Sequence, residues 1–170
     1  APTSTKNKEK QRDPEMASTR KGGQWYFGMK LHIGADSKFP IAHTVSITPA
    51  NPHDSTEFAN LLHGDETRVY GDPAYHGEPQ KAQIHAIGAK DFTQKRAYRN
   101  TPLTEDEKQA NTTKAKIRCR VEHFFHVLKN IFGAKRVRYK GIDKNGNFFF
   151  LAMGLVNIYM NRKRLLAACA

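Results

Sequence analysis

The sequence predicts an α/β fold in which a mixed sheet is flanked by helices. The predicted elements run in the order strand, strand, helix, strand, helix, strand, and then helices, which is typical of this class. The first strands alternate bulky residues with small or polar ones, and the last helix is long and rich in apolar residues. With 170 residues, the chain is long enough for one domain with its own core.

Residues 1–24 are predicted to form an extended basic arm that precedes a domain at residues 25–170. The arm is polar and charged, and its few apolar residues have no periodic spacing. Residues 25–33 and 40–48 have the composition of strands, and the turn residues at 34–38 lie between them. The two strands should therefore pair as a hairpin.

The remaining elements follow from caps, turn residues and apolar spacing. In order, we expect a helix at 54–62, a buried strand at 68–72, a helix at 79–87, a strand at 89–92, a polar loop at 93–112, a helix at 113–132 that stops before Gly133, a short extended piece at 137–139, and a helix at 147–166.

The strongest global property of the chain is its positive charge. Lys and Arg number 28 against 16 Asp and Glu, which gives a formal net charge of +12. Such an excess favours a polyanionic partner, and nucleic acid is the commonest one. The alternatives are a basic surface that serves solubility and a ribosome-associated protein.

Two further properties restrict the class of protein. The chain has two cysteines, Cys119 and Cys169, which are too few for a disulfide framework or a zinc site. Reduced thiols in the cytoplasm explain both. No apolar run is as long as a membrane span, so no membrane association is expected. The sequence also has no Ser-centred nucleophile motif and no Gly-rich phosphate loop.

The predicted helix at 113–132 gathers three charges on one narrow arc. At about 100° per residue, Arg118, Glu122 and Lys129 fall within an arc of about 40°, whereas Arg120 and His123 face the opposite way. An apolar stripe lies beside the charges and comprises Val121, Phe124, Phe125, Leu128, Ile131 and Phe132. The carboxylate could hold a metal ion beside a phosphate backbone, or the three charges could form an ordinary surface salt bridge. Taken alone, the pattern favours the salt bridge.

Asp72 is a second candidate, at the end of the predicted strand at 68–72. In α/β sheets, the carboxyl ends of strands are where ligands commonly bind. Asp72 and Glu122 together offer two hard oxygen ligands to Mg²⁺ or Mn²⁺. The alternative is that Asp72 caps the turn that begins at Pro73. Spacing alone favours the cap.

Several short motifs form one combined pattern along nearly the whole chain. They are STKN at 4–7 with RDPEM at 12–16, GQWYFGMK at 23–30 with HIGAD at 32–36, DPAYHG at 72–77, RVEH at 120–123 with Phe125, Lys129, Phe132 and Gly133, and RYKG at 138–141. Together they resemble the C-terminal part of the catalytic domain of insertion-sequence transposases of the DDE class, in the insertion-sequence-five group.

The resemblance implies a ribonuclease H-like domain in which three acidic residues bind two Mg²⁺ or Mn²⁺ ions. Asp72 matches the second acid and Glu122 the third. In relatives the first acid lies on the first strand, just upstream of the stretch that matches residues 1–5, so that strand is expected to be missing here. Asp36 is the nearest substitute, and we interpret it as a turn residue instead.

The resemblance also implies contacts with DNA. Arg118 and Lys129 match basic positions of the family that are expected to touch DNA near the transposon end. Further candidates for phosphate contacts are Arg120, His123, Arg138 and Lys140. The family often has a Tyr three residues before that Arg, whereas this chain has Ala115. No stacking or phosphate-binding Tyr is therefore assigned.

The implied function is metal-dependent cleavage and transfer of DNA strands at transposon ends. The expected partners are double-stranded DNA, at transposon ends and target, and a second copy of the complete enzyme. The expected location is the bacterial cytoplasm, with the nucleoid. Lacking the first acid, the isolated chain is expected to bind metal poorly and to be inactive. The alternatives are a non-catalytic basic DNA- or RNA-binding domain, such as a decayed transposase, and a basic structural protein.

Overall fold

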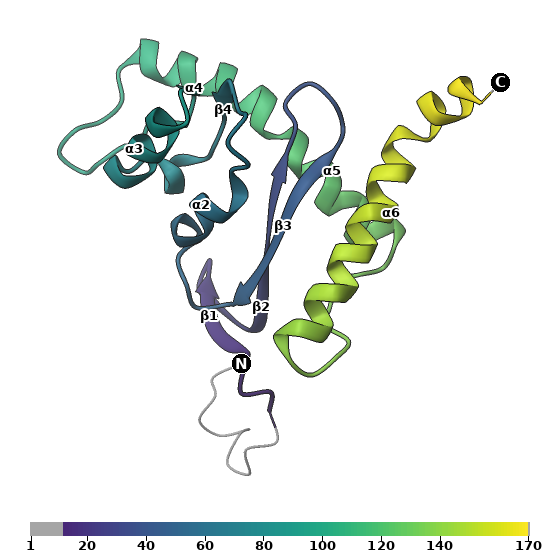
Figure 1. Ribbon diagram of the computed structural model, residues 1–170. Helices are drawn as coiled ribbons and strands as arrows, with labels where there is room; N and C mark the ends of the chain where they lie inside the picture. Colours follow the sequence, from purple (N-terminus) through teal and green to yellow (C-terminus); the bar gives the residue numbers. More distant parts are fainter. Residues whose placement is uncertain (1–11, 170) are drawn as a thin grey trace.

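The computed structural model describes residues 12–169 and shows two small sheets with helices around them. One sheet has the order β1-β2-β3 with antiparallel neighbours, and the other is a parallel pair of β4 and β5. In Figure 1, α6 runs along one side of the β2–β3 hairpin, whereas α2, α3 and β4 lie on the other side. The α/β class is confirmed. The single mixed sheet expected from the sequence is divided into two within the described residues.

The first sheet is built from β1 (Ala17–Lys21), β2 (Gln24–Ala35) and β3 (Ala42–Pro49). The turn between β1 and β2 consists of Gly22 and Gly23, whose φ values of 56° and 81° suit a tight hairpin turn. The hairpin of β2 and β3 is confirmed, with small shifts of its ends.

The expected arm at 1–24 is partly wrong. Its last part, Ala17–Lys21, forms a strand because the Gly–Gly turn folds it back onto β2. Residues 1–11 of the arm lie outside the described residues. The predicted extended piece at 137–139 also forms no strand in the structure, although the segment before α6 is held in place by hydrogen bonds.

The second sheet lies within a set of short elements. In chain order these are η1 (Asp54–Glu57), α2 (Phe58–Leu61), β4 (Arg68–Val69), η2 (Pro73–Tyr75), α3 (Glu78–Ala86) and β5 (Lys90–Asp91). They correspond to the elements predicted between residues 54 and 92. The strand expected at 68–72 is shorter, because Asp72 begins the next turn instead of ending the ladder.

The single helix expected at 113–132 is divided among three helical segments, and the first of them begins eight residues earlier than expected. They are α4 (Glu105–Arg118), α5 (Arg120–His126) and the π-helix η3 (Val127–Ile131). The start of α4 lies inside the expected loop at 93–112. It is fixed by a capping box, in which the side chain of Thr104 accepts from the N–H of Glu107 and the side chain of Glu107 accepts from the N–H of Thr104.

The helix is interrupted at Cys119, which ends α4 and precedes α5. The N–H of Glu122 donates to the carbonyl of Cys119 at 2.9 Å, which is the tighter spacing of a 3₁₀ turn. Further along, in the π-helix η3, the N–H of Phe132 donates to the carbonyl of Val127, five residues earlier, at 3.0 Å. These two irregularities rotate the residues after them away from the positions of a continuous helix. Ile131, expected in the buried stripe, is 53% exposed, whereas Val127 is buried.

The last helix, α6 (Ile142–Ala168), covers the free edge of β3. The side chain of Asn157 accepts from the N–H of Ala42 at 2.8 Å and donates to its carbonyl at 2.9 Å. Asn161 donates to the carbonyl of Pro40 at 2.8 Å. Two amide side chains thus replace the bonds that another strand would make. No helix among residues 12–169 has the length and apolar character needed to cross a bilayer.

The core is divided into two clusters. The larger joins the first sheet to α5, η3 and α6, and its most buried members are Phe124, Leu128, Met153 and Val156. The smaller contains Phe58, Val69, Ile84 and Ala89 and belongs to the second sheet. The space between the two sheets is where the sequence candidates Asp72 and Glu122 are found.

Candidate active site

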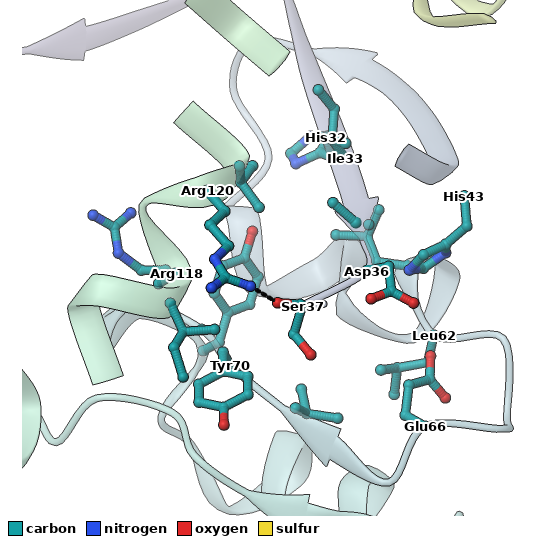
Figure 2. A pocket seen from close by; sticks show the side chains of 18 of the residues that line it. His32, Ile33, Asp36, Ser37, His43, Leu62, Glu66, Tyr70, Arg118 and Arg120 are labelled. Carbon is teal, nitrogen blue, oxygen red and sulfur yellow. Dashed lines mark hydrogen bonds between the residues drawn. The ribbon is translucent and has the colours of Figure 1, made fainter. Parts of the chain in front are cut away.

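A cavity of about 460 Å³ lies between β2 and β4 and is lined by both Asp72 and Glu122. Its walls come from residues 31–38, from residues 65–72, and from the end of α4 and the start of α5. Figure 2 shows part of this lining, with Arg118 and Arg120 on one wall and Asp36, His43 and Glu66 on another. Two carboxylates that are distant in the sequence therefore share one cavity.

Asp72 is positioned by the turn that follows β4. Its Oδ1 accepts a hydrogen bond from the N–H of Ala74 at 2.9 Å, so Asp72 is the N-cap of η2. The interpretation of Asp72 as a turn cap is confirmed. The bond fixes the direction of the carboxylate without removing it from the cavity lining.

Glu122 lies in the first turn of α5 and is paired with Arg118. The distance between Glu122 Oε1 and Arg118 Nη2 is 2.7 Å, and the Glu122 side chain is 61% exposed. The ordinary salt bridge predicted for this arc is thus present. An exposed pair of this kind contributes little to stability, so Glu122 can exchange its partner at small cost.

Arg120 also lines the cavity, although a continuous helix would turn it to the opposite face from Arg118. Its guanidinium donates to the carbonyl of Ser37, in the turn after β2 (Figure 2). The tighter turn at Cys119, which lies between Arg118 and Arg120, accounts for the difference. The Nε of Arg118 is shielded from solvent and has no hydrogen-bond partner among residues 12–169.

The other predicted DNA contacts lie outside the cavity lining. His123, Lys129, Arg138 and Lys140 are all exposed. The Nζ of Lys129 lies 5.4 Å from the centre of the Phe125 ring, and Lys129 does not line the cavity with Arg118 and Glu122.

Asp36 has the structure of a turn residue, as interpreted from the sequence. Its Oδ1 accepts from the N–H of Phe39 at 3.0 Å and from the N–H of Lys38 at 2.5 Å. These two backbone hydrogen bonds lower the pKa of Asp36. The carboxylate holds the β2–β3 turn together at the rim of the cavity.

Tyr75 is a cavity residue that sequence reasoning missed. Burial raises the pKa of Tyr75 to about 12. Nearby negative charges, which belong to Asp54, Asp72 and Glu57, act in the same direction. Tyr75 therefore keeps its proton at neutral pH and remains a hydrogen-bond donor. Its place three residues after Asp72, in a turn begun by Pro73, is the only signal in the sequence.

The motifs RDPEM and RYKG meet at the start of α6, away from the cavity lining. Asp13 Oδ2 accepts from the N–H of Gly141 at 2.6 Å, and Glu15 Oε2 accepts from the N–H of Ile142 at 2.6 Å. Two carboxylates thus satisfy amides at a helix N-terminus, where negative charge is favoured. These acids of the motif have a structural role.

The cavity carries the oxygen ligands that Mg²⁺ and Mn²⁺ prefer, but the set is incomplete. Asp72 and Glu122 supply two carboxylates. Within residues 12–169, no three side chains of His, Cys, Asp or Glu come together as a metal-binding group. The chemistry of the donors fits such an ion, which one or two carboxylates can hold together with water, although the third acid that the resemblance implies is not among the described residues.

Comparison with protein families gives a match that spans nearly all of the chain. Residues 2–158 match the family described as "Transposase DDE domain". No solved structure matches the chain.

Proposed function

Because this chain belongs to the transposase DDE domain family, we propose that it forms the C-terminal part of the ribonuclease H-like catalytic domain of a transposase in the insertion-sequence-five group. The proposal places residues 25–170 in that domain. The observation that carries it is the shared cavity, in which Asp72 and Glu122 lie on one surface with Arg118 and Arg120. The reaction is cleavage and transfer of DNA strands at transposon ends.

In this proposal the carboxylates bind metal and the cations bind phosphates. Asp72, held by its cap to Ala74, and Glu122, held only by an exposed ion pair, are two of the three acidic ligands. Bound Mg²⁺ or Mn²⁺ supplies activation of a water molecule or a 3′-hydroxyl and neutralises charge on the leaving oxygen. Arg118 and Arg120 border the same cavity, where a phosphate can replace their present partners.

Outside the cavity, the exposed residues His123, Lys129, Arg138 and Lys140 are proposed to contact the DNA backbone. Such contacts position the duplex without reading its sequence. The complete enzyme is proposed to act as a homodimer on its transposon ends and target, in the bacterial cytoplasm with the nucleoid.

Manganese is expected to strengthen DNA binding through the two acids. In fluorescence anisotropy with a DNA duplex, Mn²⁺ should raise affinity by up to about tenfold over EDTA, since an ion held even weakly by the two carboxylates would offset their repulsion of the phosphates. In the double variant Asp72→Asn, Glu122→Gln this gain should vanish, while binding in EDTA stays the same or rises slightly. A matched variant, Asp106→Asn with Asp143→Asn, removes two exposed acids outside the cavity and should keep the gain.

The same experiment distinguishes the proposed function from the alternative one. A non-catalytic DNA- or RNA-binding domain would bind equally well in Mn²⁺ and EDTA, and the double variant would behave like the matched one. That pattern would favour a decayed transposase.

The isolated chain is expected to leave supercoiled plasmid intact in Mn²⁺. The reason is that residues 12–169 bring no third acid to Asp72 and Glu122, and two carboxylates do not hold two ions in the geometry that strand cleavage needs. Gel electrophoresis of the plasmid after incubation gives the result directly. Robust nicking that disappears in Glu122→Ala would show that the acidic set of this chain is sufficient.

A further inference from the structure

The hairpin of β1 and β2 is a two-stranded ribbon that carries exposed aromatic side chains. Trp25 is 48% exposed and Tyr26 is 49% exposed, although aromatic side chains of this size usually belong to cores and interfaces. β1 pairs with residues 24–28 of β2 and packs little against any other described element. The rings near the tip of this ribbon are therefore accessible to a ligand.

The register of the ladder gathers cations and rings on one face of the ribbon. Residues directly opposite each other in an antiparallel pair share a face, and Arg20 is opposite Trp25. Phe27 is two residues further along the same face, about 7 Å from Trp25. The guanidinium of Arg12 lies over the Phe27 ring, 4.7 Å from its centre. These four residues, here called the ribbon face, combine two aromatic rings with two guanidinium groups.

The ribbon face continues to the RYKG motif at the start of α6. Asp13, at the base of the ribbon, accepts from the N–H of Gly141 at 2.6 Å. That bond holds the exposed residues 138–140, which are Arg, Tyr and Lys, beside the base of the ribbon. In Figure 1, β1 and the start of α6 lie at the same end of the molecule. The motifs RDPEM, GQWYFGMK and RYKG thus meet on one surface outside the cavity lining.

This surface is positively charged, and its nearest acids are already occupied. Residues 16–35 contain three Lys and Arg and no Asp or Glu. Asp13 and Glu15 accept from amides at the N-terminus of α6, and that helix end offsets their charge. Within residues 12–169, the cationic groups of Arg20 and Lys21 have no ion-pair or hydrogen-bond partner. Both can therefore bind an anionic ligand without breaking an existing contact.

The combination of accessible rings and cations matches a single strand of nucleic acid. Unpaired bases stack on aromatic side chains and on guanidinium planes, while the phosphates pair with cations. Trp25 offers an open ring, and the Arg12 guanidinium over Phe27 offers a second stacking plane. In a duplex the bases are stacked on one another, so the same rings would contact only the backbone.

We propose that the ribbon face and residues 138–140 form a binding site for single-stranded DNA. Bases stack on Trp25 and on the pair of Arg12 and Phe27, and the phosphates bind Arg20, Lys21 and the cations of residues 138–140. The site deepens the proposed function, since it adds an unpaired strand to the duplex partner, and it rests on that function for the choice of DNA.

Trp25 is the only tryptophan of the chain, so tryptophan fluorescence reports on this site alone. An oligonucleotide of about 12 thymidines, titrated into the whole chain in EDTA, should quench that fluorescence to saturation, because a base stacks on the indole. A duplex of the same length should quench it much less when its binding is saturated. EDTA removes metal ions from Asp72 and Glu122, so a failure here is distinct from a failure of the manganese-dependent binding proposed above.

Variants separate stacking from simple attraction of charge. In fluorescence anisotropy with the labelled oligonucleotide, Trp25→Ala should weaken binding about tenfold or more, whereas Trp25→Phe should keep most of the affinity. Duplex binding by Trp25→Ala should stay unchanged. The matched control is Phe39→Ala, which removes another exposed ring beside an arginine, in the turn after β2, and should leave both affinities unchanged. Circular dichroism checks the fold of each variant.

Absence of quenching at a saturating concentration of the oligonucleotide would overturn the proposal, and this measurement uses the unaltered chain. Equal affinities of Trp25→Ala and the unaltered chain would overturn it as well. If Trp25→Ala weakened single-strand and duplex binding equally, the ribbon would be a general phosphate contact and the proposal would be wrong. Tighter binding of an oligonucleotide of uridines would overturn the choice of DNA.

Discussion

DNA binding by this chain is expected to weaken about a thousandfold when the salt concentration rises from about 50 mM to about 200 mM. The physical reason is counterion release, in which each neutralised phosphate contributes about −0.9 to the slope of log K against log salt. The net charge of +12 favours such contacts. The six proposed phosphate contacts predict a slope of about six times that value. Fluorescence anisotropy on one duplex across a salt series measures it.

Substitutions test which cations contribute to that slope. Arg138→Gln with Lys140→Gln should reduce its magnitude by about 2, because two phosphate contacts are lost. Lys90→Gln with Lys163→Gln removes two exposed cations that are not among the proposed contacts and should change the slope less. Equal slopes for the two double variants would mean that DNA binding is spread over the whole surface. That result would favour the alternative in which the chain is a basic structural protein.

Replacement of Phe124 by Ala is expected to remove most of the stability of the fold. Phe124 is 1% exposed at the centre of the larger core cluster, where α5 meets the first sheet and α6. Truncation of a buried Phe costs about 3–5 kcal/mol, close to the whole free energy of unfolding of many domains. Urea denaturation followed by far-UV circular dichroism gives the change.

The matched control for this substitution is Phe150→Ala. Phe150 is 69% exposed on α6, and its truncation should change the free energy of unfolding by less than about 0.5 kcal/mol. A loss for Phe124→Ala that is as small as the loss for Phe150→Ala would contradict the assignment of Phe124 to the core.

The sequence predicted the elements that depend on local pattern. The β2–β3 hairpin follows from alternation and turn residues, and the short helix expected at residues 79–87 is present as α3. The start of α4 was missed although Thr104 and Glu107 form a capping box, because the following residues are polar and gave no apolar stripe. A helix with no buried residue is specified by its cap and propensity alone.

The candidate site was predicted in part. The resemblance to transposases selected Asp72 and Glu122, and the structure places both on one cavity. The position of Arg120 depends on a bend at Cys119 that contains neither Gly nor Pro, so nothing in the local sequence marks it. Tyr75 lies in the turn capped by Asp72, but its burial beside the cavity depends on packing against Phe58, a tertiary contact that the local sequence does not show.

The bonds from Asp13 and Glu15 to the start of α6 determine when the domain can finish folding during its synthesis. The first of these bonds joins residues that are 128 positions apart. Closing a loop of that length costs about 4 kcal/mol of chain entropy, so the bonds form after other contacts have brought the segments together. On the ribosome, Asp13 and Glu15 are synthesised well over a hundred residues before their partners Gly141 and Ile142. The order of translation thus places the attachment of α6 among the last steps of folding.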